Sequence, residues 1–169
     1  MDELKRSVDY SRKRLQAIRN CEAHVADILW KSTQKIISAS KRYRGAGRLT
    51  NESALLSYAK NVTAEAEESI NSYISAYSKA SCKILGIDSE NIESFLVSDI
   101  YGKTTSERNA VYLGNFAEDI VRMIKAGTLM GYSDQQILSS IRTGYKDPYH
   151  TSVITKAKRK DINIDVPSY

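Results

Sequence analysis

The sequence predicts an all-α protein. Its 169 residues include only 2 prolines and 8 glycines, so long stretches run without a residue that breaks a helix. A β-sandwich or barrel of this size needs turn residues about every ten positions, and the chain does not supply them. Apolar residues make up 41% of the chain and recur at intervals of three and four, which is the repeat of one helix face.

The longest such repeat predicts one long helix from the N-terminus. Ten positions separated alternately by four and three residues follow one line, and seven of them are apolar: Leu4, Val8, Ser11, Leu15, Ile18, Glu22, Val25, Leu29, Ser32 and Ile36. A period of 3.5 residues is typical of a narrow apolar seam, as in coiled coils. Residues 41–48, which include Gly45 and Gly47, then predict a turn.

A second long helix is predicted from Thr50 or Asn51, either of which can accept a hydrogen bond from the first free amides, to Gly86. Its seam is smaller and rich in alanine: Leu55, Ala59, Val62, Ala66, Ile70, Tyr73, Tyr77, Ala80 and Ile84. Alanines allow a partner helix to approach closely. Because the connection is short, residues 1–86 predict a long antiparallel helical hairpin, with arms of about 45 Å each.

Shorter helices are predicted for residues 87–155, packed on or beyond the hairpin. Side chains that cap helix starts are found at Asp88-Ser89, at Thr104 with Glu107, at Ser133 with Gln136, and at Asp147-Pro148. The glycines predicted to end these helices are Gly102, Gly127 and Gly144. Residues 156–169 predict a basic linker and an extended C-terminal arm. We expect one domain overall.

The net charge of +5 is unevenly distributed. Residues 1–48 carry +7, residues 49–100 carry −5 and residues 101–169 carry +3. In an antiparallel hairpin the positive first arm lies against the negative second arm, so much of the basic excess is neutralised internally. The overall charge is therefore only weak support for nucleic-acid binding.

Residues for catalysis or metal binding are few. Cys21 and His24 lie one helical turn apart, but two ligands do not make a stable zinc site, and a packed pair on a helix face is the better interpretation. The segment 45–48, Gly-Ala-Gly-Arg, lacks the preceding strand and the Lys-Ser/Thr ending of a phosphate loop. No window approaches the roughly 18 apolar residues of a membrane span. We expect no catalytic residue, cofactor, metal or membrane contact.

Basic side chains are the main candidates for contact with a partner. Four of them, Lys41, Arg42, Arg44 and Arg48, surround Tyr43 at the predicted turn, and positive charge beside an aromatic ring is typical of phosphate-binding surfaces. The remaining candidates lie in the first helix and near the C-terminal end: Arg12, Lys13, Arg14, Lys156, Lys158, Arg159 and Lys160. The same residue types also occur on any solvated helix, so an acidic protein surface is an alternative partner.

Residues 108–169 carry a further pattern. It consists of Phe116-Ala117-Glu118-Asp119-Ile120 through Ala126-Gly127, then Gly131-Tyr132-Ser133 with Ile137, Leu138 and Ile141, then Asp147-Pro148, then a basic linker to Val166-Pro167-Ser168-Tyr169. This stretch resembles the region that precedes the defining domain in phage head morphogenesis proteins of the Mu F type, minor capsid proteins, especially those of phages and prophages of gut Bacteroidota. The family pattern is a helix, a glycine turn and a short capped helix before an Asp-Pro step. The family's core domain is not part of the sequence.

The resemblance implies a non-enzymatic, low-copy structural protein, present in the virion and in the host cytoplasm during assembly. Its implied partners are portal or capsid proteins of a phage, with DNA and a second copy of the chain as further candidates. The alternative from the residues themselves is a basic helical nucleic-acid-binding protein, in which Arg12, Lys13, Arg14 and Arg44 neutralise phosphates. An enzyme, such as a toxin domain of the kind fused to some head proteins, would require a deep polar pocket.

Overall fold

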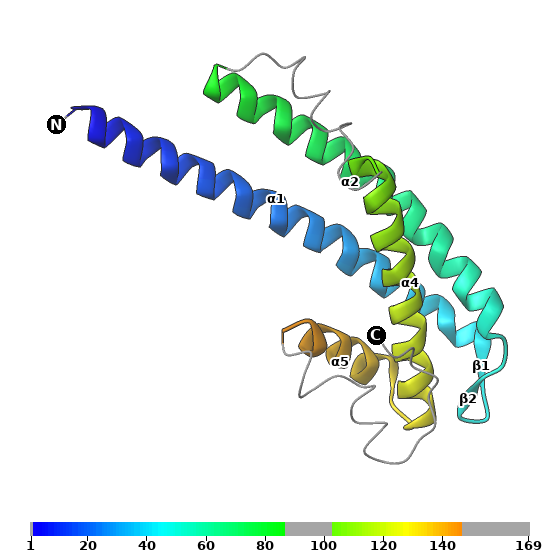
Figure 1. Ribbon diagram of the computed structural model, residues 1–169. Coiled ribbons are helices and arrows are strands. Elements are labelled where there is room, and N and C mark those ends of the chain that lie inside the picture. The colour runs from blue at the N-terminus through cyan, green and yellow to red at the C-terminus, as the bar shows by residue number, and fades with distance from the viewer. Residues whose placement is uncertain (1, 87–102, 147–169) are drawn as a thin grey trace. The chain divides into compact units, whose positions relative to one another are not determined.

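The computed structural model describes residues 2–86 and 103–146. In order, the elements are α1 (Asp2–Ser40), the short 3-10 helix η1 (Lys41–Tyr43), β1 (Arg44–Gly45), β2 (Arg48–Leu49), α2 (Glu52–Leu85), α4 (Thr105–Leu129) and α5 (Asp134–Lys146) (Figure 1). The predicted all-α class is confirmed, with one two-residue strand pair added. The predicted cap at Asp88-Ser89, the Asp147-Pro148 step and the tail at 156–169 lie outside the described residues.

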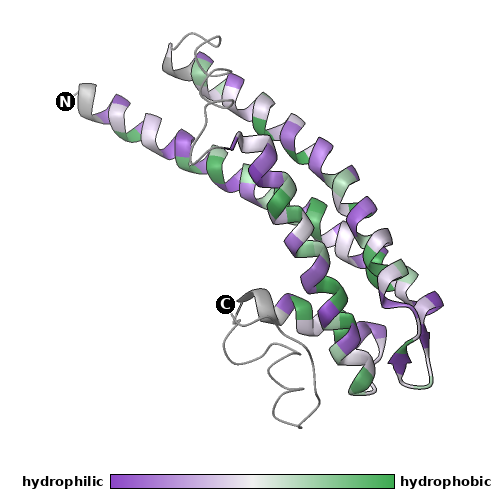
Figure 2. Ribbon diagram, turned by 45° about the vertical axis from the view of Figure 1, so that its right-hand side comes forward, coloured by the Kyte–Doolittle hydropathy of each residue, from purple (hydrophilic) through white to green (hydrophobic). Residues whose placement is uncertain are grey.

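The predicted helical hairpin is formed by α1, of 39 residues, and α2, of 34 residues. Strands β1 and β2 connect them, with Arg44 paired to Leu49 and Gly45 paired to Arg48. The two residues between the strands, Ala46 and Gly47, have φ of 49° and 73°, as a tight type I′ hairpin turn requires. Hydrophobic and hydrophilic residues alternate along the helices, as expected of amphipathic elements (Figure 2).

The predicted helix starts are confirmed by their capping bonds. The Asn51 side chain accepts from the Ala54 amide at 3.1 Å and so caps α2. At α4, the Thr104 amide donates to Glu107 Oε2 at 2.6 Å, and the Glu107 amide donates to Thr104 Oγ1 at 3.2 Å. The same reciprocal pair starts α5, where Ser133 and Gln136 exchange bonds of 2.8 and 3.3 Å. Each cap satisfies amides that the first helical turn leaves unpaired.

Two predicted helix ends are wrong. Helix α4 continues through Gly127 to Leu129, and α5 continues through Gly144 to Lys146. The glycine that ends α4 is Gly131, at φ 71°, where the Gly131 and Tyr132 amides donate to the Thr128 and Gly127 carbonyls at 3.0 and 2.8 Å. Gly127 has another role: a Cβ on it would lie 2.5 Å from Ile137 Cγ1, so its lack of a side chain lets α5 approach α4.

The chain divides into two compact units, which we describe separately. Of the described residues, unit 1 contains 2–30, 65–86 and 103–111, and unit 2 contains 31–64 and 112–146. Unit 2 has a core of eleven buried side chains from four helices: Ile36, Ile37, Leu55, Ala59, Val62, Ala117, Ile120, Val121, Ile124, Ile137 and Ile141. The ends of the long hairpin helices, α4 and α5 therefore share one apolar interior in this unit.

Unit 1 combines a few buried apolar groups with polar contacts between helices. Ala66, Ile70 and Cys82 of α2 are buried. Asn71 of α2 accepts from Asn109 Nδ2 of α4 at 2.7 Å, and its own Nδ2 donates to Ser106 Oγ at 3.2 Å. Amide hydrogen bonds of this kind fix how two helices align, because their geometry is directional.

Candidate functional site

The tip of the hairpin, formed by η1, β1 and β2, carries the first group of predicted contact residues. The short strand pair positions them, and the Thr50 amide closes the tip by donating to the Tyr43 carbonyl at 2.7 Å. Tyr43 is half-buried and packs against the core of unit 2. The five predicted residues of the tip are thus held close together, but their side chains serve different purposes.

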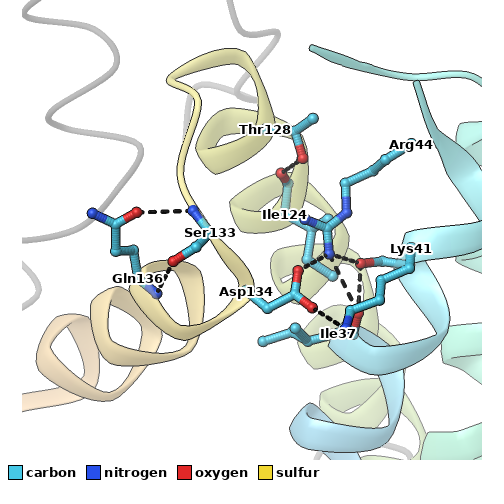
Figure 3. A network of polar contacts seen from close by, with 9 residues as sticks. Ile37, Lys41, Arg44, Ile124, Thr128, Ser133, Asp134 and Gln136 are labelled. Atoms are coloured by element: carbon cyan, nitrogen blue, oxygen red, sulfur yellow. Dashed lines mark hydrogen bonds and ion pairs between the residues drawn. The ribbon is translucent and has the colours of Figure 1, made fainter. Parts of the chain in front are cut away.

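Arg44 is turned inward and links three segments of unit 2. Its Nη2 donates to Asp134 Oδ1 at 2.5 Å and to the Ile37 carbonyl at 3.4 Å, and it also contacts the Ser40 hydroxyl (Figure 3). The side chain is only 14% exposed, and its Nε has no hydrogen-bond partner within the described residues. This geometry attaches the start of α5 to the hairpin and removes Arg44 from the surface available to a partner.

Lys41 shares the same carboxylate. Its Nζ lies 3.2 Å from Asp134 Oδ2, so one aspartate faces two cations (Figure 3). Asp134 also lies in the first turn of α5, where a negative charge interacts favourably with the helix dipole. From the sequence, this region was predicted only to cap a helix, through Ser133 and Gln136. The available signal was a lone acidic residue at a helix start in a chain whose tip carries four cations.

Arg42 and Arg48 are the two exposed tip cations that Asp134 does not engage, and they form no ion pair with other residues of the described segments. Arg42 lies at an open hollow of about 520 Å³, which is also lined by Lys31 and Lys35 of α1 and by Tyr58 of α2. A second hollow of about 370 Å³ lies nearby and includes Asp134 and Leu138. The first hollow therefore has a basic rim with one aromatic ring, as a site for phosphate or for a carboxylate-rich surface requires.

The second group of predicted residues lies in unit 1. Arg12, Lys13 and Arg14 are exposed on α1 and have no ion pair in the part of the chain that is described. Apolar side chains of the same helix, Val8 and Leu15, are exposed beside them. The third group, Lys156, Lys158, Arg159 and Lys160, lies outside the described residues.

His24 and Cys21, which lie one helical turn apart on α1, do not form a metal site. His24 stacks on Tyr73 of α2 with ring centroids 4.0 Å apart and an interplanar angle of 25°. Cys21 is a free thiol whose pKa is raised by burial and, to a lesser degree, by the neighbouring Glu22. Neither residue has the further ligands that a metal needs, and the described residues contain no cluster of three or more His, Cys, Asp or Glu.

An acidic pair on α4 belongs to the ion pairs of unit 2. Glu118 Oε1 lies 2.9 Å from Lys60 Nζ of α2, and Asp119 Oδ1 accepts from Arg122 at 3.0 Å. Partial burial raises the pKa of Asp119; Arg122 opposes that rise and Glu118 adds to it. A raised carboxyl pKa also occurs in active sites, but here Glu118 faces a lysine that joins α2 to α4, and Asp119 faces an arginine of its own helix.

Comparisons with known proteins give no relative. No protein-family model, no curated protein and no solved structure matches the chain at a significant level. Among the helices that are described, none has the length and hydrophobicity needed to cross a lipid bilayer.

Proposed function

We propose that this chain is a non-enzymatic assembly module of a tailed-phage head, which docks on portal or capsid proteins. The observation that carries the proposal is the sequence of elements in the segment that resembles Mu F-type head morphogenesis proteins. Helix α4, the turn at Gly131 and the capped helix α5 follow the helix, glycine turn and short capped helix of that pattern. A helical hairpin with an exposed basic tip also suits docking between macromolecules.

Arg42 and Arg48 are the residues of the tip that such a docking surface uses. Both are exposed, whereas Arg44 and Lys41 are occupied by Asp134. Portal and capsid surfaces that offer carboxylates would pair with these two arginines, and each such pair adds specificity more than raw affinity. The tip therefore provides orientation.

Co-purification tests the proposal. The full chain is co-expressed with the portal and major capsid proteins of the phage or prophage that carries its gene, and complexes are isolated and cross-linked. We expect the wild-type chain to associate and the R42E/R48E variant to associate roughly tenfold less, because two favourable charge pairs become repulsive. The matched control is K83E/K103E, which makes the same charge change at exposed residues of unit 1. No association of the wild type with either protein would remove the proposal.

The alternative function is nucleic-acid binding at the same tip. It is supported by Arg42, which has no ion pair among the described residues and lies beside Tyr58 at the hollow, because a cation with an aromatic ring fits a phosphate backbone. Lys31 and Lys35 of the same rim already have interactions of their own. Binding of duplex DNA is measured by fluorescence anisotropy over a range of salt concentrations. This function requires the logarithm of affinity to fall with the logarithm of salt by about 0.9 per neutralised phosphate, and R42E/R48E to lower the slope by about 2. A flat salt dependence would exclude it.

A further inference from the structure

The first half of α1 exposes an apolar line that the hairpin does not cover. Val8 is 43% exposed, Leu15 is 56% exposed and Ile18 is 36% exposed, whereas Ile36 on the same line is fully buried. The line was predicted to face the second helix along its whole length. In the structure its burial is complete only toward the end of α1, so the N-terminal half presents an uncovered seam.

The exposed seam has the spacing of a coiled-coil interface. Val8, Ser11, Leu15 and Ile18 are separated by three, four and three residues, which places them on one narrow face. We call this face, together with its edges, the α1 face. A seam of two positions per seven residues packs against the matching seam of a partner helix in a coiled coil. A helix that lies in a membrane surface presents a broader apolar side. Ser11 narrows the apolar part further.

Both edges of the α1 face are basic. Lys5, Arg12 and Arg19 recur every seven residues and follow one edge, and Arg14 lies on the other edge. All four are exposed and have no ion-pair partner among the described residues. Asp9 projects from a position of the helical repeat that lies away from the seam, and Glu22, the next residue of the line after Ile18, marks the end of the α1 face.

This charge pattern disfavours a second copy of the chain as the occupant. In a parallel pair, Arg14 would face Arg19 of the other copy, and in an antiparallel pair Lys5, Arg12 and Arg19 would face one another. Like charges at such flanking positions oppose association and determine which partner is chosen. An occupant with acidic edges turns each of these contacts into an attraction.

We propose that the α1 face binds an acidic amphipathic helix of a partner protein, which presents apolar residues at coiled-coil spacing and Glu or Asp on both flanks. Leu15 and Ile18 supply the apolar contact, and Lys5, Arg12, Arg14 and Arg19 pair with the flanking carboxylates. The inference deepens the proposed function, on which it rests, because it gives the chemistry of the segment by which a head protein would be held. It assigns this contact to unit 1, whereas Arg42 and Arg48 of the tip belong to unit 2.

The test uses the full chain and two designed probe helices of about four heptads each. Both carry Leu and Ile at the seam positions, but one has Glu on both flanks and the other has Lys. Binding is measured by anisotropy of the labelled helix. We expect the Glu helix to bind and the Lys helix to bind at least about tenfold more weakly, with a difference that shrinks as salt rises.

Two variants of the chain separate the apolar and ionic contributions. L15D places a charge in the seam and is expected to weaken binding of the Glu helix at least about tenfold while leaving the thermal midpoint unchanged, because Leu15 is exposed in the free chain. R12E/R19E is expected to reverse the preference between the two probe helices. The control is Y112D, which adds a charge at an apolar residue of α4 that is 68% exposed and should leave binding unchanged.

Each of the following results would overturn the inference. The wild-type chain fails to bind the Glu helix, or binds the Lys helix equally well. Sedimentation shows a dimer that L15D dissociates, which makes a second copy the occupant. Vesicles with anionic lipid bind through Leu15 while the Glu helix does not. A thiol introduced by L15C reacts with maleimide as slowly as the buried Cys82, which means that this chain covers its own seam.

Failure of the inference is distinguishable from failure of the proposed function. If the Glu helix binds but portal and capsid proteins do not associate with the chain, the helix-binding role of the α1 face is supported and the proposed phage function is contradicted. If the head proteins associate with the chain and L15D changes neither that association nor binding of the Glu helix, the docking function is supported and the assignment of the α1 face as the binding surface is contradicted.

Discussion

Gly127 offers the sharpest test of the packing in unit 2, because one substitution there has two opposing effects. Replacing a helical glycine by alanine stabilises a helix by up to about 1 kcal/mol. At this position, however, the new Cβ would lie 2.5 Å from Ile137 Cγ1 and 3.0 Å from Ile137 Cδ1. Carbon atoms that do not bond prefer about 3.5–4.0 Å, so α5 would have to move by about 1 Å. Ile137 is fully buried, so its side chain cannot relieve the clash by turning into solvent.

Overpacking of this kind costs about 1–3 kcal/mol, and the 2.5 Å approach places G127A in the upper part of that range. After the helix gain of up to about 1 kcal/mol, we expect G127A to lower the free energy of unfolding by a net value of about 1–2 kcal/mol. The measurement is urea unfolding followed by helical circular dichroism. The matched control is G114A in the same helix, where an added Cβ meets no atom within 4 Å, and it should raise stability by up to about 1 kcal/mol.

A double variant identifies the contact. In the G127A background, I137A should cost less than it does alone, with a coupling of at least about 0.5 kcal/mol, because the new methyl group occupies part of the space vacated by the isoleucine. If G127A is as stable as the wild type, or gains as much as G114A, the close approach of α4 and α5 is not as described and the reasoning fails.

Four further predictions concern polar contacts and the tip. D134A should destabilise the fold by about 2–3 kcal/mol, because it leaves the largely buried Arg44 charge without its carboxylate, and R44M/D134A should lose less than the sum of the single variants in a double-mutant cycle. T104A should cost about 1 kcal/mol as a lost helix cap, measured by thermal unfolding. The backbone and side-chain hydrogen bonds from Thr104 lower the pKa of Glu107 in the folded state. The stability that Glu107 contributes is therefore present above its unfolded pKa and is lost as pH falls through the lower folded pKa. E107Q should flatten the dependence of the urea midpoint on pH across this acidic range. A46N should raise stability by up to about 1 kcal/mol, since Ala46 has a positive φ that asparagine tolerates better, and no change in urea midpoint would contradict this account of the turn.

Local signals in the sequence predicted the helix starts correctly. The caps at Asn51, Thr104 and Ser133 each use a hydrogen bond between residues three positions apart, so everything needed to recognise them lies within one turn. The end of α2 before Gly86 was predicted by the same kind of local reasoning and is confirmed by the positive φ of that glycine.

Contacts between distant segments could not be predicted. A glycine such as Gly127 looks the same in a sequence whether it ends a helix or admits a neighbouring helix, and only the position of Ile137 distinguishes the two cases. Arg44 and Asp134 are 90 residues apart, and nothing in their local surroundings joins them. The apolar line of α1 was recognised, but periodicity alone does not say which part of a seam the chain itself covers.

The side chain of Asn71 has a consequence for how uniquely unit 1 folds. Its oxygen accepts from Asn109, and its nitrogen donates to Ser106 and, at 3.5 Å, to Glu67. Aliphatic surfaces tolerate sliding, but a slip of α4 along α2 by one helical turn, about 5.4 Å, would break the bonds that join the two helices. Asn71 therefore fixes the register of α4 on α2. The N71L substitution would allow several alignments of these helices with nearly equal energy, whether or not it strengthened their contact.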